Sequence, residues 1–210
     1  MDDEQKRAAT IDREHFRNAY SEKAPWDIGR PQAVFRALAD KVIGSVLDAG
    51  CGTGEHALFF ASRGHEVTGF DFLEEAIAAA KRKAEERKLA ATFLVKDALK
   101  LQGWPARFDN VIDSGLFHVF SDEDRARYVL GLKTALKRGG HLFLLCFSDQ
   151  TPGTDGPRRV SQAELRDAFS EGWEIKSIEP ARLEVRPEPR QARYSGEDPR
   201  GWLLVAQRVA

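Results

Sequence analysis

The chemically most suggestive part of the chain is a turn at 48–54, where Gly50, Gly52 and Gly54 follow the apolar stretch Val46-Leu47. Glycines between the end of a strand and the start of a helix allow a ligand to approach the backbone closely. A dinucleotide site is the competing interpretation, but its G-x-G-x-x-G fingerprint needs a small residue where this chain has Glu55. A carboxylate there would repel a pyrophosphate and would tolerate a ligand carrying an ammonium and a sulfonium. An ordinary tight turn is the structural alternative.

Four aspartates form a second signal, because Asp48, Asp71, Asp97 and Asp113 each end or closely follow a predicted strand. In an open α/β sheet, ligands bind outside the carboxyl ends of the strands. Asp71 can accept hydrogen bonds from both hydroxyls of a ribose, and Asp97 can accept one from the exocyclic amine of a purine. Each aspartate taken singly is also typical of a helix cap or a turn. Together they predict a site for a cationic ligand rich in hydroxyls.

The elements that must position these residues alternate regularly between Ser45 and Phe147. The expected strands cover 46–47, 66–70, 92–95, 108–112 and 141–147. The expected helices cover 55–63, 73–89 and 121–137, the last one stopped by Gly139-Gly140. Strands and helices at this spacing predict an α/β fold with a mostly parallel sheet.

The flanking regions have a different character. Residues 1–24 form a polar helix or arm, and a further helix is expected to begin at Pro31. After a loop at 151–159, a helix at 161–169 with a capping box precedes two strands, 173–185 and 202–209. These two strands have no helix between them, so they are most simply antiparallel. We expect one domain over 1–210, with N-terminal helices at 1–44, a binding core at 45–147 and a C-terminal part at 148–210.

The segment 48–54, with Asp71, Asp97 and Asp113, resembles the motifs of class I S-adenosylmethionine (SAM)-dependent methyltransferases, over roughly Ser45 to Phe147. The resemblance implies a Rossmann-like fold with a seven-stranded, mostly parallel sheet in the order 3-2-1-4-5-7-6, the last strand antiparallel, and helices on both faces. It also implies SAM as cofactor and S-adenosylhomocysteine as product. The cofactor-binding residues that it implies are Trp26, Arg30, Asp48, Gly50, Cys51, Gly52, Asp71, Phe72, Asp97, Ala98, Asp113 and Ser114.

A narrower resemblance lies in the segment 25–31, Pro-Trp-Asp-Ile-Gly-Arg-Pro. It looks like the N-terminal signature of the thiopurine, thiol and halide methyltransferases, in which the Trp segment folds over the cofactor as a lid. Together with 114–118 and 156–161, the chain is also similar to mycobacterial heterocyclic toxin methyltransferases, which act on hydroxyquinolones. Arg30 stands where many thiol and halide enzymes have Gln, which favours the heterocycle branch. Trp26 as a plain core aromatic is the alternative.

These resemblances imply methyl transfer to a heteroatom, oxygen before nitrogen or sulfur, of a small aromatic or heterocyclic molecule. His118 follows the fourth strand and is the candidate catalytic residue. A neutral imidazole suits a general base for an acidic hydroxyl or thiol, and the alternative is that His118 only shapes the pocket. Phe16, Tyr20 and Phe117, with His118, are the expected substrate-binding residues, because an aromatic cavity suits a flat molecule.

Composition narrows the remaining classes. The 32 basic and 33 acidic residues nearly cancel, so we expect no nucleic-acid partner. No apolar run approaches the ~20 residues of a membrane span, the first residues are acidic and unlike a signal peptide, and no residues have metal-ligand spacing. Cys51 and Cys146 predict no disulfide framework, which favours the cytoplasm. A monomer or a homodimer acting on a small molecule is expected. The alternatives are a thiol/halide-type S-methyltransferase, a nicotinamide oxidoreductase and a non-catalytic SAM-binding protein.

Overall fold

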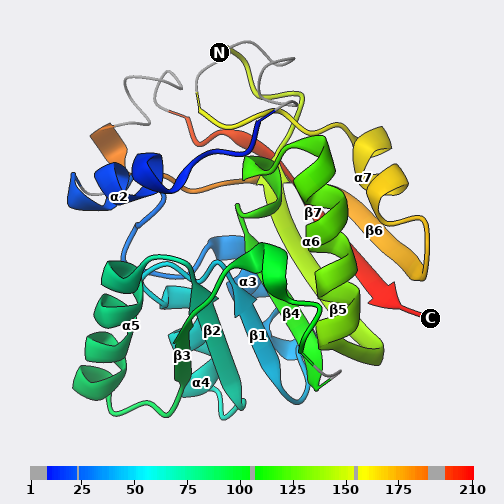
Figure 1. The fold of residues 1–210 in the computed structure, drawn as a ribbon. Helices are drawn as coiled ribbons and strands as arrows, with labels where there is room; N and C mark the ends of the chain where they lie inside the picture. Colours follow the sequence, from blue (N-terminus) through cyan, green and yellow to red (C-terminus); the bar gives the residue numbers. More distant parts are fainter. Residues whose placement is uncertain (1–8, 23, 105–106, 154–155, 189–196) are drawn as a thin grey trace.

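The structure is a computed structural model that describes residues 9–22, 24–104, 107–153, 156–188 and 197–210 (Figure 1). Its strands are β1 (Val46–Ala49), β2 (Val67–Asp71), β3 (Thr92–Val95), β4 (Phe108–Ser114), β5 (Leu136–Phe147), β6 (Trp173–Arg182) and β7 (Arg200–Arg208). Its α-helices are α2 (Arg13–Ser21), α3 (Ala33–Ala37), α4 (Glu55–Ser62), α5 (Glu74–Arg87), α6 (Asp122–Ala135) and α7 (Gln162–Ala168). Short 3-10 helices are η1 (Ala39–Lys41), η2 (Ala98–Lys100) and η3 (Phe117–Val119).

The strands form one seven-stranded sheet in the order β3-β2-β1-β4-β5-β7-β6, which confirms the predicted topology. β1 pairs in parallel with β2 and β4, whereas β7 runs antiparallel to both β5 and β6. The chain therefore proceeds in one direction from β1 to β3 and in the other direction from β4 to β5. The loops after β1 and β4 meet at this switch point, which is where open α/β sheets bind ligands.

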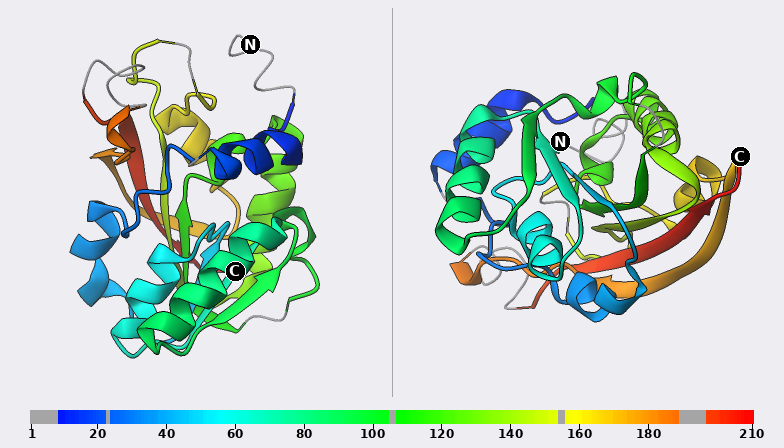
Figure 2. Two further views of the ribbon diagram at one scale, coloured as in Figure 1. Left: turned by 90° about the vertical axis from the view of Figure 1, so that its left-hand side faces the viewer. Right: turned by 90° about the horizontal axis from the view of Figure 1, so that it is seen from below.

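Helices lie on both faces of the sheet (Figure 2), and an apolar layer lies between the sheet and the helices on each face. Alternate residues of β5 illustrate the division, since Leu142 and Leu144 belong to the layer under α6 and α7. Phe143 and Leu145 belong to the layer under α3, α4 and α5. Successive side chains of a strand point to opposite faces, so a strand covered by helices on both sides must be apolar throughout.

The passage from α6 to β5 differs from the sequence prediction. The helix ends at Ala135, and Leu136 is already extended and pairs with Phe108 of β4. Gly139-Gly140 therefore lies inside β5 and does not end the helix. The pairing then shifts register before Asn110 meets His141, and Gly139 takes a φ of +83° at this irregularity. The glycine pair serves a bend in a strand, which sequence alone does not separate from a helix stop. β6 also ends at Arg182, three residues short of the predicted Val185.

A strap consisting of residues 9–22 and 24–32, with α2 at its centre, crosses the carboxyl ends of the parallel strands (Figure 1). At its beginning, the Ile11 amide donates to the Val119 carbonyl (2.9 Å). At its far end, the Gln32 amide group donates to the Glu184 carbonyl (2.9 Å). The strap is thus fixed to the body on both sides of α2. In the described residues, no helix is long and apolar enough to cross a membrane.

Candidate active site

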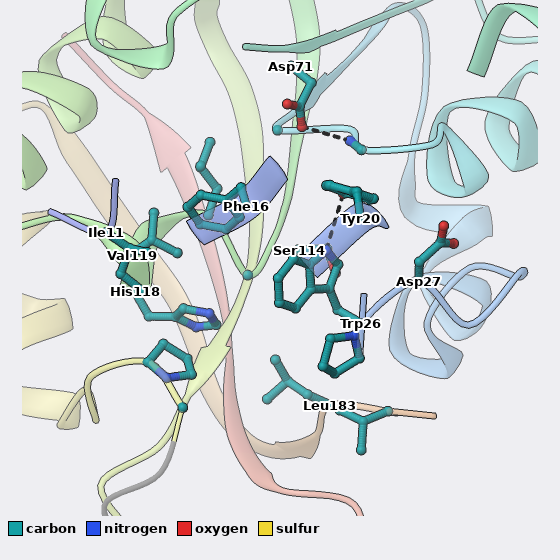
Figure 3. A pocket seen from close by; sticks show the side chains of 18 of the residues that line it. Ile11, Phe16, Tyr20, Trp26, Asp27, Asp71, Ser114, His118, Val119 and Leu183 are labelled. Carbon is teal, nitrogen blue, oxygen red and sulfur yellow. Dashed lines mark hydrogen bonds between the residues drawn. The ribbon is translucent and has the colours of Figure 1, made fainter. Parts of the chain in front are cut away.

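A cavity of about 620 Å³ lies between the strap and the loops that follow β1, β2 and β4 (Figure 3). The predicted site residues that line it are Phe16, Tyr20, Trp26, Arg30, Gly50, Cys51, Gly52, Asp71, Phe72, Ser114 and His118. Figure 3 shows Asp27 and Asp71 on one side of this cavity and His118 on the other. The structure therefore brings together residues from the strap, the glycine turn and the end of β4.

The glycine turn has a backbone that side chains other than glycine rarely adopt. Gly50, Gly52 and Gly54 have φ angles of +65°, +52° and +87°. A Cβ added at Gly52 would overlap the Tyr20 hydroxyl, and one added at Gly50 would press on Leu116 at 3.0 Å. The turn thus leaves its backbone open to the cavity, because glycine keeps the approach free and tolerates the left-handed conformation. This cradle fits a ligand that contacts the backbone.

Asp71 at the end of β2 holds the turn and faces the cavity. One carboxylate oxygen accepts from the Gly52 amide (3.0 Å) and the other from the Leu73 amide (3.0 Å). Burial raises the pKa of Asp71, and these backbone donors partly oppose that rise. Each carboxylate oxygen can accept more than one hydrogen bond. Asp71 can therefore accept hydroxyls of a ligand while it keeps the turn in place.

Asp48 and Asp113 lie outside the cavity lining, and their expected place around and beneath the methionine part of the cofactor stays a prediction. Asp48 lies beneath the turn and accepts from the Ala57 amide (2.9 Å). Asp113 accepts from the Leu116 amide (2.8 Å) and from the Tyr128 hydroxyl (2.9 Å). Burial raises the pKa of each carboxyl to about 7, opposed by these donors. Both aspartates thus organise the loops from below.

Three further predicted residues also lie outside the cavity lining. Asp97 caps η2 by accepting from the Leu99 amide (2.9 Å), and Ala98 is part of the apolar layer under α6. Phe117 is fully buried against Phe169, with ring centroids 5.7 Å apart, so it packs in the core, and its contact with a substrate stays a prediction. Contact of Asp97 and Ala98 with an adenine stays a prediction.

Glu55 has a different role from the one inferred from the sequence. Its carboxylate accepts from Lys83 (2.8 Å) and forms a bidentate pair with Arg87 (2.9 Å to each oxygen). These cations lower the pKa of Glu55, although burial opposes the shift. Glu55 therefore ties α4 to α5 and is already neutralised. The spacing of the glycines still argues against a site for the pyrophosphate of a dinucleotide. The Glu55 carboxylate, however, is not free to bind the ammonium of a ligand.

Aromatic side chains of the strap form the roof of the cavity. The Trp26 indole N–H donates to the Tyr20 hydroxyl (3.1 Å), and the Phe16 ring meets Trp26 and Phe72 edge to face, with centroids 5.7 and 5.6 Å apart. Trp26 is 38% exposed and belongs to neither apolar layer. It is therefore not a core aromatic, which is the alternative that its sequence context left open.

His118 in η3 is buried and has a defined tautomer. The Phe147 amide of β5 donates to Nδ1 (3.0 Å), so in the neutral ring the proton is on Nε2. Burial, together with the charges of Arg125 and Arg159, lowers the pKa of His118 to about 3. His118 therefore presents an N–H donor to the cavity, which favours the positioning role over the general base.

The cavity also contains residues that the sequence reasoning missed. Asp27 accepts a hydrogen bond from the Thr53 hydroxyl (3.1 Å). Its position between Trp26 and Arg30 in the segment 25–31 is the sequence feature that could have identified it as a site residue. Other missed lining residues come from the strap, from α4, from η3 and from the chain after β6: Gln32, His56, Val119, Leu183, Glu184 and Val185. Arg30, a predicted residue, pairs there with Glu184 (2.7 Å). The chain after β6 has no local pattern that marks a site.

Comparison with known proteins gives a consistent assignment. A family model described as a methyltransferase domain matches residues 46–140. A 2-heptyl-1-hydroxyquinolin-4(1H)-one methyltransferase of Mycobacteroides abscessus is 38% identical over 195 residues, 88% of this chain and 86% of that protein. A solved structure from work on the conversion of a disulfide bond into a thioacetal group during echinomycin biosynthesis has a TM-score of 0.79 at 36% identity. That match covers 93% of this chain and 92% of the other.

A further solved structure shares the fold. It is a Burkholderia thailandensis 1,6-didemethyltoxoflavin-N1-methyltransferase with bound 1,6-didemethyltoxoflavin and S-adenosylhomocysteine. Its TM-score is 0.73 at 21% identity, and the match covers 94% of this chain and 87% of that chain. The open glycine turn, the buried Asp71 at its side and the sheet order agree with these matches. The chain belongs to the class I SAM-dependent methyltransferases.

Proposed function

We propose that this methyltransferase transfers the methyl group of SAM to an oxygen of a small, flat heterocyclic molecule such as a hydroxyquinolone. The observation that carries the proposal is the aromatic cavity of about 620 Å³ that joins the glycine turn to His118. Its size and its lining by Phe16, Tyr20 and Trp26 suit a flat ligand beside the cofactor. The hydroxyquinolone methyltransferase of M. abscessus, similar over most of both chains, supports this substrate class.

The residues that would hold the cofactor follow from the same geometry. The backbone of the turn around Gly50 and Gly52 receives its methionine part, and Asp71 accepts from its ribose hydroxyls. Phe72 covers the adenine, and Trp26 with Arg30 closes the roof. When bound, SAM supplies an activated methyl group. The protein aligns the acceptor with it and excludes water, which accounts for most of what such a transfer requires.

Sulfur is the second candidate acceptor, because the echinomycin-related structure, at 36% identity, concerns sulfur chemistry. The alternative that SAM binds without turnover is also testable. The protein is incubated with SAM and a hydroxyquinolone, a phenol, an aromatic thiol or iodide. Product mass and S-adenosylhomocysteine are then measured by mass spectrometry. We expect the hydroxyquinolone to be methylated fastest. Faster methylation of the thiol would replace oxygen by sulfur, and cofactor binding without any product would support a binding protein.

The control for this assay is a pair of variants at glycines that both have a positive φ, +52° at Gly52 and +88° at Gly64. Gly52→Ala adds a Cβ that overlaps Tyr20 inside the cavity. Gly64→Ala adds one at a φ of +88° where no atom lies within 4 Å, after α4 and away from the site. Product formation that is lost with Gly52→Ala and kept with Gly64→Ala attributes the activity to this cavity.

A further inference from the structure

The charges around the cavity are unevenly distributed. On the side of the glycine turn, Asp27 and Asp71 face the cavity, and neither forms an ion pair within the described part of the chain. On the side of His118, the lining includes Arg158, and Arg125 and Arg159 lie close enough to His118 for their charges to lower its pKa. A cofactor with an ammonium and a sulfonium suits the acidic side. The opposite side has the charge that suits an anion.

The arginines behind His118 form a buried basic layer, which we define as Arg125, Arg158 and Arg159. Arg125 of α6 is 4% exposed, and its guanidinium carbon lies 4.2 Å from the centre of the Phe117 ring. Its Nε and Nη2 have no hydrogen-bond partner among the residues that the structure describes. Its carboxylate neighbour, Glu164 of α7 (3.6 Å), also pairs with Arg158 (2.5 Å). Glu164, whose side chain is 19% exposed, thus contacts two buried cations.

Among the described residues, the other ionisable groups around His118 offset this positive charge only in part. Asp122 also pairs with Arg158 (2.6 Å), so Arg158 contacts two carboxylates, whereas Arg125 has only Glu164, at 3.6 Å, among the described residues. Burial raises the pKa of the Cys146 thiol in β5, which therefore stays neutral. Asp113 at the end of β4 has a pKa raised to about 7 by burial and is only partly charged near neutral pH. Arg125 therefore keeps positive charge beside His118.

Access to His118 is open on the side of Nε2. Gly115 has a φ of +88°, and a Cβ there would lie 3.5 Å from Nε2 and 3.3 Å from Cε1. Glycine at 115 therefore leaves the N–H edge of the ring uncovered. The opposite edge of the ring is fixed by the Phe147 amide, so the ring cannot turn over without losing that hydrogen bond.

We propose that the methyl acceptor binds as an anion, held by the Nε2–H of His118 and favoured by the buried basic layer, so that His118 positions the acceptor and takes no proton from it. This inference rests on the proposed function and names its substrate class: acidic hydroxyls of aromatic heterocycles. In the transfer, a lone pair of the acceptor oxygen forms a bond to the methyl carbon. The carbon–sulfur bond breaks and leaves its electron pair on sulfur. Anion and sulfonium both become neutral, and no proton remains to be removed.

The first test varies the acidity of the acceptor. We measure kcat/KM against pH for the wild type with a hydroxyquinolone, 4-nitrophenol and phenol, whose hydroxyls differ in acidity. Anion binding predicts that the midpoint of each profile moves with the ionisation of that acceptor. A midpoint common to all three, set by an enzyme group, would overturn the inference. Calorimetric binding of S-adenosylhomocysteine is measured in parallel. Loss of that binding, or the absence of any methylated product, would refute the proposed function itself.

The second test separates a donor from a base with His118→Gln and His118→Ala. Glutamine keeps an N–H donor and has no basic nitrogen, so a positioning role predicts that His118→Gln keeps most of the kcat/KM. His118→Ala should lose about 10- to 100-fold, the range for a hydrogen bond to a charged group. Equal losses in both variants, with cofactor affinity intact, would contradict the donor role. Cofactor affinity also shows that each variant is folded.

The third test removes one buried charge. Arg125→Met keeps the length of the side chain, and we expect the KM for 4-nitrophenol above its pKa to rise about 10-fold with kcat little changed. The matched control is Arg127→Met on the same helix, whose side chain is 50% exposed and pairs with Asp124 (2.9 Å). An unchanged KM in folded Arg125→Met, or an equal rise in Arg127→Met, would overturn the role of the basic layer.

Discussion

Replacement of Asp113 by asparagine should make the protein more stable at neutral and alkaline pH. Asp113 is fully buried, and burial raises its pKa from 3.8 to about 7. Asparagine has nearly the same shape, and its oxygen can accept from the Leu116 amide as the carboxylate does at 2.8 Å. Its amide group can donate to the Tyr128 hydroxyl in place of the present acceptor. The variant therefore keeps a hydrogen bond to each partner and removes the buried charge, although the Tyr128 O–H loses its present acceptor.

The sign follows from the direction of the shift. A carboxyl whose pKa is higher in the folded state than in the unfolded chain binds its proton more tightly when folded. The contribution of Asp113 to the free energy of unfolding is thus fully favourable below about pH 3.8, and it is lost as the pH rises to about 7. A rise of the pKa from 3.8 to about 7 corresponds to a loss of unfolding free energy on the order of 4 kcal/mol, as an upper bound. Wild type should lose this free energy of unfolding between these pH values, and Asp113→Asn should not.

The assay is urea unfolding of both proteins at several pH values from about 4 to about 8. We expect the difference in unfolding free energy to grow with pH in favour of Asp113→Asn. Asp109→Asn is the matched control, because Lys137 at 2.8 Å lowers the pKa of Asp109 to about 2. Because the pKa of Asp109 is lower in the folded state, its charge stabilises the fold at pH values above its pKa in the unfolded chain. The difference in unfolding free energy between wild type and Asp109→Asn should therefore be constant above about pH 5. A flat difference for Asp113→Asn would refute the buried-charge reasoning.

Three other substitutions test the cavity. Gly52→Ala should weaken S-adenosylhomocysteine binding at least about 10-fold by calorimetry. Adding Tyr20→Phe should restore part of this affinity, because the ring carbon Cζ of residue 20 lies at a tolerable 3.5 Å from the new Cβ. If affinity is not restored, overlap with the Tyr20 hydroxyl is not the cause. Asp71→Ala should weaken cofactor binding by about 1.5–3 kcal/mol per lost ribose hydrogen bond and lower the melting temperature, since the Gly52 and Leu73 amides lose their acceptor; unchanged affinity would contradict its role. Trp26→Ala should raise the KM for cofactor and acceptor and leave the apo melting temperature nearly unchanged, since Trp26 is 38% exposed; a large loss of stability would make it a structural residue.

The fold was predictable because each of its signals is local. Apolar stretches of strand length, the glycine turn at 48–54 and the capping box at Ser161 each specify their own element. The alternation of elements then restricts the topology to few possibilities. The start of β5 was not predictable, because Gly139-Gly140 suits both the end of a helix and a bend in a strand, and only pairing with β4 distinguishes them.

The site was predictable only in part, for a physical reason that the aspartates illustrate. Sequence shows that Asp48, Asp71 and Asp113 lie at strand ends, but it does not show which backbone amides reach each carboxylate. Asp71 stays in the cavity lining, whereas Asp48 and Asp113 are satisfied from within the protein. Likewise, His118 was identifiable as a candidate, but its tautomer depends on the Phe147 amide from a distant strand. Such partners arise from tertiary packing and leave no local pattern.

The strap has a consequence for how ligand affinity is distributed. Its helix α2 has nine residues and none of them is buried, and a helix of this length has little stability of its own in water. Both ends of the strap are nevertheless attached, so it can lose helical order without leaving the cavity. Part of the free energy of ligand binding is then spent on ordering α2, and the amides of α2 should exchange hydrogen more slowly when both ligands are bound. We therefore expect each ligand to strengthen the binding of the other through the helix that both of them order, in addition to their direct contact.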